Sequence, residues 1–150
     1  MSVFYKNMHL FSYEKEKLLF TDIKMCENEI LNNKNKQNIR CRYCNSLILR
    51  NQQGEYTKLQ VDLPLMHQKN TRDVNTVETE KLIDFWLVND MFIFENVGFS
   101  NTVDKRKYLT CADCDIGPLG YFDINTKKCY LALQRVHYGN ELVKDVNVLT

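Results

Sequence analysis

Two Cys-x-x-Cys pairs constrain this chain more than any other feature: Cys41 with Cys44, and Cys111 with Cys114. Two thiolates separated by two residues can bind one metal ion from a tight turn. A second such turn completes the tetrahedron that Zn²⁺ prefers, with Zn–S distances of about 2.3 Å. Compact ribbon-type sites place only about 15–20 residues between their pairs, and the interval here is far longer. The metal is therefore expected to join two distant segments of one domain.

Disulfides or redox chemistry are the alternative uses of such pairs. Disulfides persist in oxidising compartments, but residues 1–20 carry several charges and lack the uninterrupted apolar core of a signal peptide. No stretch approaches the ~18 apolar residues of a membrane span. We therefore expect a cytosolic or nuclear protein whose cysteine pairs bind one zinc ion. Because cysteine fills all four positions, the zinc is expected to be structural rather than catalytic.

The charge balance argues against a nucleic-acid partner. The formal net charge of the 150 residues is +1, and four thiolates with one Zn²⁺ would bring it to about −1. Such a balance creates no field that attracts nucleic acid or acidic membranes. The short basic cluster at 104–107 begins with an acid and is interpreted as a solvated turn. A zinc-ribbon nucleic-acid module stays an alternative, but it would need a basic face interleaved with aromatic residues.

The N-terminal region differs in composition from the rest of the chain. Five apolar positions there could line one face of a helix: Leu18, Leu19, Phe20, Ile23 and Met25. The run 32–38 is rich in asparagine and lysine, has no apolar residue, and predicts a linker or flexible loop. The folded domain is therefore expected to begin near residue 38, after an arm and linker over 1–37.

The region after Cys44 predicts short strands. Aromatic and branched residues alternate with turn signals, which gives strands over 46–50, 55–63, 82–88, 91–94, 107–111, 119–123 and 129–136. Residues 66–80 form a long polar loop. No helix of convincing length is expected after residue 40, so the domain is predicted to be mostly β.

Residues 90–99 are more apolar than one buried face requires. In a strand, Phe92 and Phe94 would share a face, and Ile93 would share the other face with Glu95. Both faces are then partly apolar. The segment is either buried on both sides or an exposed apolar surface for a partner. Outside the paired cysteines, Cys129 is interpreted as a small buried hydrophobe, and Cys26 lies in the arm.

Three segments together resemble the Rab-interacting factor (Mss-four/Dss-four) family. They are the run DMFIFENVGF at 90–99, the run YLTCADCDIGPLG at 108–120 and the run YLALQRV at 130–136, with LPLM at 63–66 also fitting. The resemblance covers about residues 38–138, with both cysteine pairs at the family's positions. Residues 1–37 and the tail 139–150 lie outside it.

The resemblance implies a β-tent fold with one structural zinc held by Cys41, Cys44, Cys111 and Cys114. It further implies a chain, monomeric when free, that binds exocytic Rab GTPases in their nucleotide-free form, without stable membrane insertion. Such a protein promotes release of GDP or GTP and then holds the empty GTPase, as an exchange factor and chaperone without chemical catalysis. Carried over by motif, the Rab-binding residues would be Asp90, Met91, Phe92, Phe94, Glu95, Asn96 and Val97.

One enzymatic alternative uses the same fold. Methionine sulfoxide reductases of the B type share the β-tent and a similar zinc site, and use a strand cysteine as nucleophile. Cys129 is the only candidate for that role, and it has no cysteine or histidine partner nearby in sequence.

Overall fold

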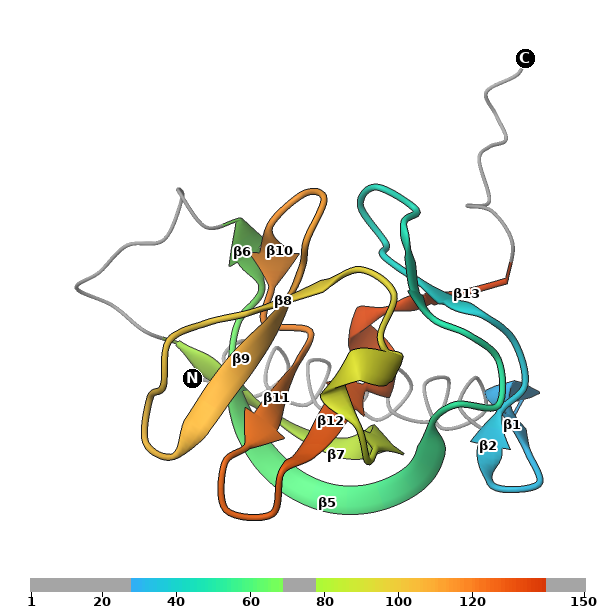
Figure 1. Cartoon of the computed structure of the whole chain (residues 1–150), viewed down its shortest axis with the longest axis horizontal. Coiled ribbons are helices and arrows are strands. Elements are labelled where there is room, and N and C mark those ends of the chain that lie inside the picture. The colour runs from blue at the N-terminus through green and yellow to red at the C-terminus, as the bar shows by residue number, and fades with distance from the viewer. Residues whose placement is uncertain (1–27, 69–77, 140–150) are drawn as a thin grey trace, which may run out of the picture.

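The computed structural model describes residues 28–68 and 78–139 (Figure 1). Its strands are β1 (Ile30–Leu31), β2 (Lys34–Asn35), β3 (Ile39–Arg40), β4 (Leu47–Leu49), β5 (Glu55–Pro64), β6 (His67–Gln68), β7 (Thr79–Val88), β8 (Val97–Phe99), β9 (Arg106–Cys111), β10 (Ile116–Gly117), β11 (Gly120–Asp123), β12 (Lys128–Ala132) and β13 (His137–Tyr138). Two 3-10 turns interrupt them, η2 (Met91–Ile93) and η3 (Leu133–Arg135). The predicted mostly β class is confirmed.

The strands form three antiparallel sheets. The largest has eight strands in the order β1-β2-β5-β7-β12-β11-β9-β8, and β5 curves strongly beneath its neighbours (Figure 1). A three-stranded sheet has the order β13-β3-β4, and β10 pairs with β6. Within the described ranges, no helix is long and apolar enough to cross a bilayer.

Two apolar clusters organise the interior. The first cluster joins the eight-stranded sheet to the three-stranded sheet, because Ile39, Ile48 and Leu49 pack with Trp86 and Leu131, and all five side chains are fully buried. The second cluster consists of Val61, Leu63, Leu82, Phe85, Tyr121 and Ala132, with Tyr108 and Tyr130 packed against it. The first cluster includes Cys41 and Cys111, one cysteine of each pair, and so connects the cysteine turns to the core.

The asparagine-rich run at 32–38, predicted to be a linker, is part of the fold. Leu31 pairs with Lys34 across a two-residue turn in which Asn32 and Asn33 have φ of 52° and 67°. These positive values are those of a type I′ hairpin, which favours asparagine. The prediction of a linker over this run is therefore wrong, because the run supplies the hairpin β1–β2.

Asn35 anchors that hairpin from a fully buried position. Its Nδ2 donates to the carbonyls of Gln37 (2.9 Å) and Arg50 (3.0 Å), and its Oδ1 accepts from the Gly54 amide (2.8 Å). A buried amide with every partner satisfied is stable where an unsatisfied one would be costly. Polar composition alone did not reveal this buried role.

Most predicted strands are present, and two segments differ. Residues 91–94 were predicted to be a strand but begin with the 3-10 turn η2, and the predicted strand 129–136 ends at Ala132, where η3 begins. Most of the predicted loop 66–80 lies outside the described residues, as do residues 1–27, with the possible helix face and Cys26, and most of the C-terminal tail. The domain boundaries at 38 and 138 stay predictions.

Candidate metal centre and partner surface

Each cysteine pair forms the same kind of tight turn. In the first, the Asn45 amide donates to the Cys41 carbonyl at 2.9 Å, and Asn45 has a φ of 66°. In the second, the Asp115 amide donates to the Cys111 carbonyl at 2.9 Å, and Asp115 has a φ of 62°. Asparagine and aspartate are the non-glycine residues that adopt this left-handed conformation most readily. The residue after each pair therefore closes a turn that points two sulfur atoms in one direction.

The four sulfur atoms come together although the two turns are far apart in sequence. Cys41 Sγ lies 3.6 Å from Cys114 Sγ, Cys44 Sγ lies 3.5 Å from Cys111 Sγ, and all four lie within 4.8 Å of one another. A tetrahedron with Zn–S distances of about 2.3 Å has sulfur–sulfur edges of about 3.8 Å. The four cysteines can therefore hold one metal ion.

The protonation of the thiols also fits a cation site. Burial raises the pKa of Cys111, and it raises the pKa of Cys114 to about 11. Burial acts in the same direction on Cys44, but hydrogen bonds, chiefly from Ser46, outweigh it and lower the pKa of that thiol to about 7. Four adjacent thiolates are thus unfavourable without a positive charge among them, and a coordinated divalent cation supplies that charge.

Asp113 connects the metal turns to the segment predicted to bind a partner. Its Oδ2 accepts from the Ser46 hydroxyl, next to the first turn, and from Asn96 Nδ2 at 2.6 Å. These two hydrogen bonds lower the pKa of the Asp113 carboxyl. A backbone hydrogen bond joins the same two segments, since the Ala112 amide donates to the Asn96 carbonyl at 3.1 Å. The second cysteine turn therefore positions Asn96.

Residues 90–94 do not continue a strand, so the predicted alternation of their side chains is wrong. The Asp90 Oδ1 caps η2 by accepting from the Phe92 amide at 2.9 Å, and the Ile93 amide donates to the Asp90 carbonyl at 3.1 Å. The carboxylate cap competes successfully with strand pairing at this point. Phe92 and Glu95 are thus not related as opposite faces of one strand.

The turn separates the seven predicted partner residues into two groups. Met91, Phe94 and Val97 are half-buried against the first cluster. Phe92 is 86% exposed, by far the most exposed of the large apolar side chains that the structure describes. Asp90 and Glu95 are also exposed, and Asn96 is half-buried at Asp113. The apolar members anchor the segment, and Phe92 projects from it into solvent.

Glu95 is held in place from both its backbone and its side chain. Its amide donates to the Ile48 carbonyl at 2.9 Å, and its Oε2 accepts from Arg50 Nε at 2.9 Å. The four exposed or polar members of the segment, Asp90, Phe92, Glu95 and Asn96, therefore have defined positions beside the metal turns. We call this region, residues 90–97, the partner surface, because the family resemblance predicts that it binds a partner.

Cys129 lacks the surroundings of a nucleophile. Its side chain is fully buried in the first cluster. Burial, with a smaller contribution from Asp90, raises the pKa of the thiol to about 12. Reactive cysteines have a low pKa and are partly exposed, so the geometry does not favour the reductase alternative.

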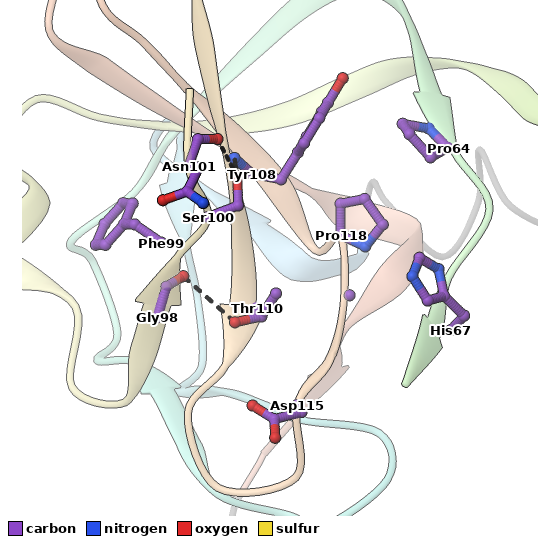
Figure 2. Close-up of a pocket in the computed structure, with 11 residues that line it drawn as sticks. Pro64, His67, Gly98, Phe99, Ser100, Asn101, Tyr108, Thr110, Asp115 and Pro118 are labelled. Atoms are coloured by element: carbon purple, nitrogen blue, oxygen red, sulfur yellow. Dashed lines mark hydrogen bonds between the residues drawn. The ribbon is translucent and has the colours of Figure 1, made fainter. Parts of the chain in front are cut away.

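A pocket of about 440 Å³ lies between β8–β9 and the β6–β10 pair (Figure 2). Phe99, Tyr108 and Pro118 contribute apolar surface, and His67 and Asp115 are placed at separate points of its lining. His67 Nδ1 lies 3.2 Å from the Leu65 carbonyl, and among the described residues no hydrogen bond joins His67 to Asp115. The pocket therefore presents no acid–base pair.

Comparison with known proteins gives consistent matches. The sequence profile of the family described as "Mss4 protein" matches residues 34–138. A Drosophila melanogaster protein named "Guanine nucleotide exchange factor MSS4 homolog" is 56% identical over 108 residues, which cover 72% of this chain and 88% of that protein. A Schizosaccharomyces pombe protein of the same name is 34% identical over 94 residues, covering 62% of this chain and 87% of that protein.

Proposed function

This chain belongs to the Mss4 protein family, and from that premise we propose that it binds exocytic Rab GTPases in their nucleotide-free form. In this proposal it promotes release of GDP or GTP and stabilises the empty GTPase, acting as both exchange factor and chaperone. The names of the Drosophila and fission-yeast relatives as guanine nucleotide exchange factors support a small GTPase as the partner class.

The exposed ring of Phe92 is the observation that carries the proposal. A capped 3-10 turn holds it, with 86% of its surface in solvent, above half-buried side chains that fix the turn to the core. Water around an exposed apolar ring is unfavourable for the free protein. Burial of the ring in a partner's pocket would remove that contact with water and favour binding. Glu95 and Asn96 beside it supply polar contacts of fixed direction.

Release of nucleotide follows from linkage and requires no chemical step in this chain. If the protein binds empty GTPase more tightly than loaded GTPase, it lowers the affinity of the GTPase for its nucleotide by the same factor. Asp90 and Glu95 are the carboxylates of the partner surface. They would act by repelling phosphate nearby, or by pairing with a GTPase lysine that otherwise contacts phosphate.

We further propose that the ion held by the four cysteines is Zn²⁺ with a structural role. An all-cysteine tetrahedral set is typical of structural zinc, and the sulfur spacing fits one ion. Bound there, zinc would supply no reactive position. It would fix the two turns, and through Asp113 it would fix Asn96. We place the protein in the cytosol, with transient residence at membranes that carry Rab proteins in vesicle transport.

The decisive experiment compares nucleotide states of one GTPase. A panel of Rab proteins would be presented in nucleotide-free, GDP-loaded and GTP-loaded form, and complex formation would be measured by calorimetry or pulldown. We expect tight binding only to the nucleotide-free form of exocytic members, and dissociation of that complex by excess GDP or GTP. Equally tight binding to the GTP-loaded form would identify a downstream effector and overturn the proposal.

A further inference from the structure

Two hairpin ends that are distant in sequence lie side by side in the fold. The first is the turn between β8 and β9, where Asp104 and Lys105 form a two-residue hairpin. The second is the turn over residues 124–127, between β11 and β12. The Ile124 amide donates to the Lys105 carbonyl at 3.1 Å and joins the two ends. Both ends lie on one edge of the molecule, opposite the edge that carries the β3–β4 and β9–β10 loops with the cysteine pairs (Figure 1).

Basic side chains gather on these two ends. We call residues 103–107 and 123–128 the basic end. Its cations are Lys105, Arg106, Lys107, Lys127 and Lys128. Five cations against two acids leave an excess of +3, whereas the whole chain carries +1, so the rest of the chain is net negative. The net charge therefore conceals a polarity that appears only when the fold joins the two turns.

The acids near the basic end are fewer than its cations. Asp123 lies directly opposite both Arg106 and Lys128 in the sheet, so its cross-strand neighbours are cations. One further acid lies nearby, because the charge of Asp90 contributes to raising the pKa of Cys129, the residue after Lys128. With Asp90 counted, the basic end still has an excess of +2.

The outermost points of the basic end present these charges to solvent. Lys105, Lys127 and Lys128 are exposed, and Val103 beside them is 49% exposed. Lys105 and Lys127 have φ of 65° and 61°, in the left-handed region where glycine and asparagine are favoured. Each turn therefore carries a lysine at a tip position where the backbone favours a smaller residue.

We propose that the basic end docks the protein on membranes that carry anionic lipids. Lysines on two protruding turns can approach a flat layer of anionic headgroups together. The exposed side chain of Val103 can enter the boundary between headgroups and acyl chains. Because a few lysines give only weak binding, the docking is peripheral and reversible.

Nucleic acid fits the basic end less well than a membrane does. Proteins that bind single strands without sequence preference place aromatic side chains beside their cations, and the bases stack on them. The basic end contains no aromatic residue. The guanidinium carbon of Arg106 lies 4.6 Å from the ring centroid of Tyr121, so that ring is already stacked under a side chain of the protein itself.

Docking through the basic end would direct the cysteine turns away from the membrane (Figure 1). Asn96 of the partner surface is hydrogen-bonded to Asp113 in the second of these turns. That part of the partner surface would therefore stay open to a GTPase. Weak docking would also raise the local concentration of the protein near a GTPase on the same membrane. This consequence rests on the proposed function, whereas the docking itself does not.

Vesicle sedimentation of the full-length chain, with no GTPase present, tests the docking. Vesicles of phosphatidylcholine would be compared with vesicles in which roughly one third of the lipid is phosphatidylserine. We expect binding only to the anionic vesicles. The binding should disappear when the salt is raised from about 0.1 to about 1 M, which shortens the Debye length from about 10 to about 3 Å. Equal binding to both kinds of vesicle, or none to the anionic ones, would overturn the proposal.

Two charge-matched variants locate the contact. K105Q/K127Q removes the two tip lysines, and K34Q/K36Q removes two exposed lysines near the opposite edge of the eight-stranded sheet. The partition coefficient on anionic vesicles should fall about 30-fold for K105Q/K127Q, the equivalent of about 1 kcal/mol for each lysine. It should stay within about 2-fold of wild type for K34Q/K36Q, whose charges are distant and screened. Equal losses would show that net charge governs the binding and would overturn the proposal.

Further arms cover folding and the nucleic-acid alternative. K105R/K127R keeps both charges and should bind like wild type, and all variants should keep the wild-type metal content and melting temperature. Binding of a fluorescent single-stranded oligonucleotide that K105Q/K127Q weakens, without vesicle binding, would assign the basic end to nucleic acid and overturn the proposal. Because no GTPase enters these assays, their failure is distinguishable from failure of the proposed function.

Discussion

Arg50 and Glu95 form an ion pair in which Nε lies 2.9 Å from Oε2. The pair joins the residue that follows β4 to the segment that follows η2, beside the hydrogen bond from the Glu95 amide to the Ile48 carbonyl. The two side chains are 62% and 38% exposed, so solvent screens the pair and its net contribution to stability is about 0–1 kcal/mol. Its main effect is to fix the direction in which the Glu95 carboxylate is presented.

Glu95→Ala should slow release of a fluorescent GDP analogue from a matched exocytic Rab. The free energy of unfolding should fall by less than about 1 kcal/mol, because only an exposed ion pair is lost. Arg50→Ala removes the same ion pair but keeps the carboxylate, so it controls for the stability loss and should slow release less than Glu95→Ala does. Release at the wild-type rate with Glu95→Ala would show that this carboxylate has no part in exchange.

Phe92→Ala should weaken binding of nucleotide-free Rab and leave the stability of the fold almost unchanged. Because the ring is 86% exposed, its removal should change the free energy of unfolding by no more than about 0.5 kcal/mol. Affinity for nucleotide-free Rab should fall by about 2 kcal/mol or more, the size expected of an interfacial anchor. Val103→Ala truncates another exposed apolar side chain, outside residues 90–97, and should bind normally. Calorimetry and urea unfolding measure the two quantities, and undiminished affinity would remove Phe92 from the interface.

Cys44→Ser and Cys111→Ser should lose the metal and fail to fold stably. Metal binding at such sites is worth roughly 10–16 kcal/mol, comparable to the whole stability of a domain, about 5–15 kcal/mol. Cys129→Ala serves as the control, because it removes a buried thiol that binds no metal and should retain one zinc per chain. Elemental analysis and circular dichroism report the outcome. A folded, soluble, metal-free wild-type protein would contradict the assignment.

Asn35→Ala should destabilise the fold because it leaves backbone groups without their hydrogen-bond partner. The carbonyls of Gln37 and Arg50 and the amide of Gly54 would lose their side-chain partner, and each unsatisfied buried group costs about 1–3 kcal/mol. The expected loss in urea unfolding is therefore about 2 kcal/mol or more. Lys36→Ala, at an exposed position of the same run, should be near neutral. Equal stabilities of the two variants would refute the anchoring role.

Alkaline pH should weaken the fold partly through Cys129. The thiol keeps its proton up to a pKa of about 12 in the folded protein, whereas an unfolded thiol titrates near about 8.5. The folded state thus binds the proton more tightly, so this stabilisation is complete below about pH 8.5 and declines as the pH rises toward 12. Urea unfolding at pH 7 and pH 10 should show a smaller loss for Cys129→Ala than for wild type. Identical losses would show that the thiol is not protected.

The β class and the clustering of the four cysteines could both be predicted from the sequence, for the same reason. Strand alternation and Cys-x-x-Cys spacing are local patterns with strong geometric consequences, and β5, β7, β9 and β11 follow them closely. The family resemblance supplied a prediction that local pattern cannot make, namely which surface faces a partner.

The errors arose where one side-chain hydrogen bond decides the backbone. At Asp90, a carboxylate cap turns an aromatic run into η2, although the composition of the run favours a strand. At Asn35, a polar side chain is buried because backbone groups of Gln37, Arg50 and Gly54 converge on it. The cap at Asp90 is a local contact, whereas two of the three contacts at Asn35 are tertiary. Hydropathy registers neither kind. The paired asparagines at 32–33 were the one local sign of the hairpin.

The long interval between the two metal turns affects the timing of synthesis. Cys44 and Cys111 are 67 positions apart, so at about 5–20 residues per second the second turn is made roughly 3–13 s after the first. During that interval the nascent chain offers only a two-sulfur half-site, and β7 to β9, which bring the halves together, are still being made. A metal ion would therefore gain its full set of four ligands only after most of the β domain has been synthesised. A shortage of metal would then affect chains in which β1 to β9 have already been made.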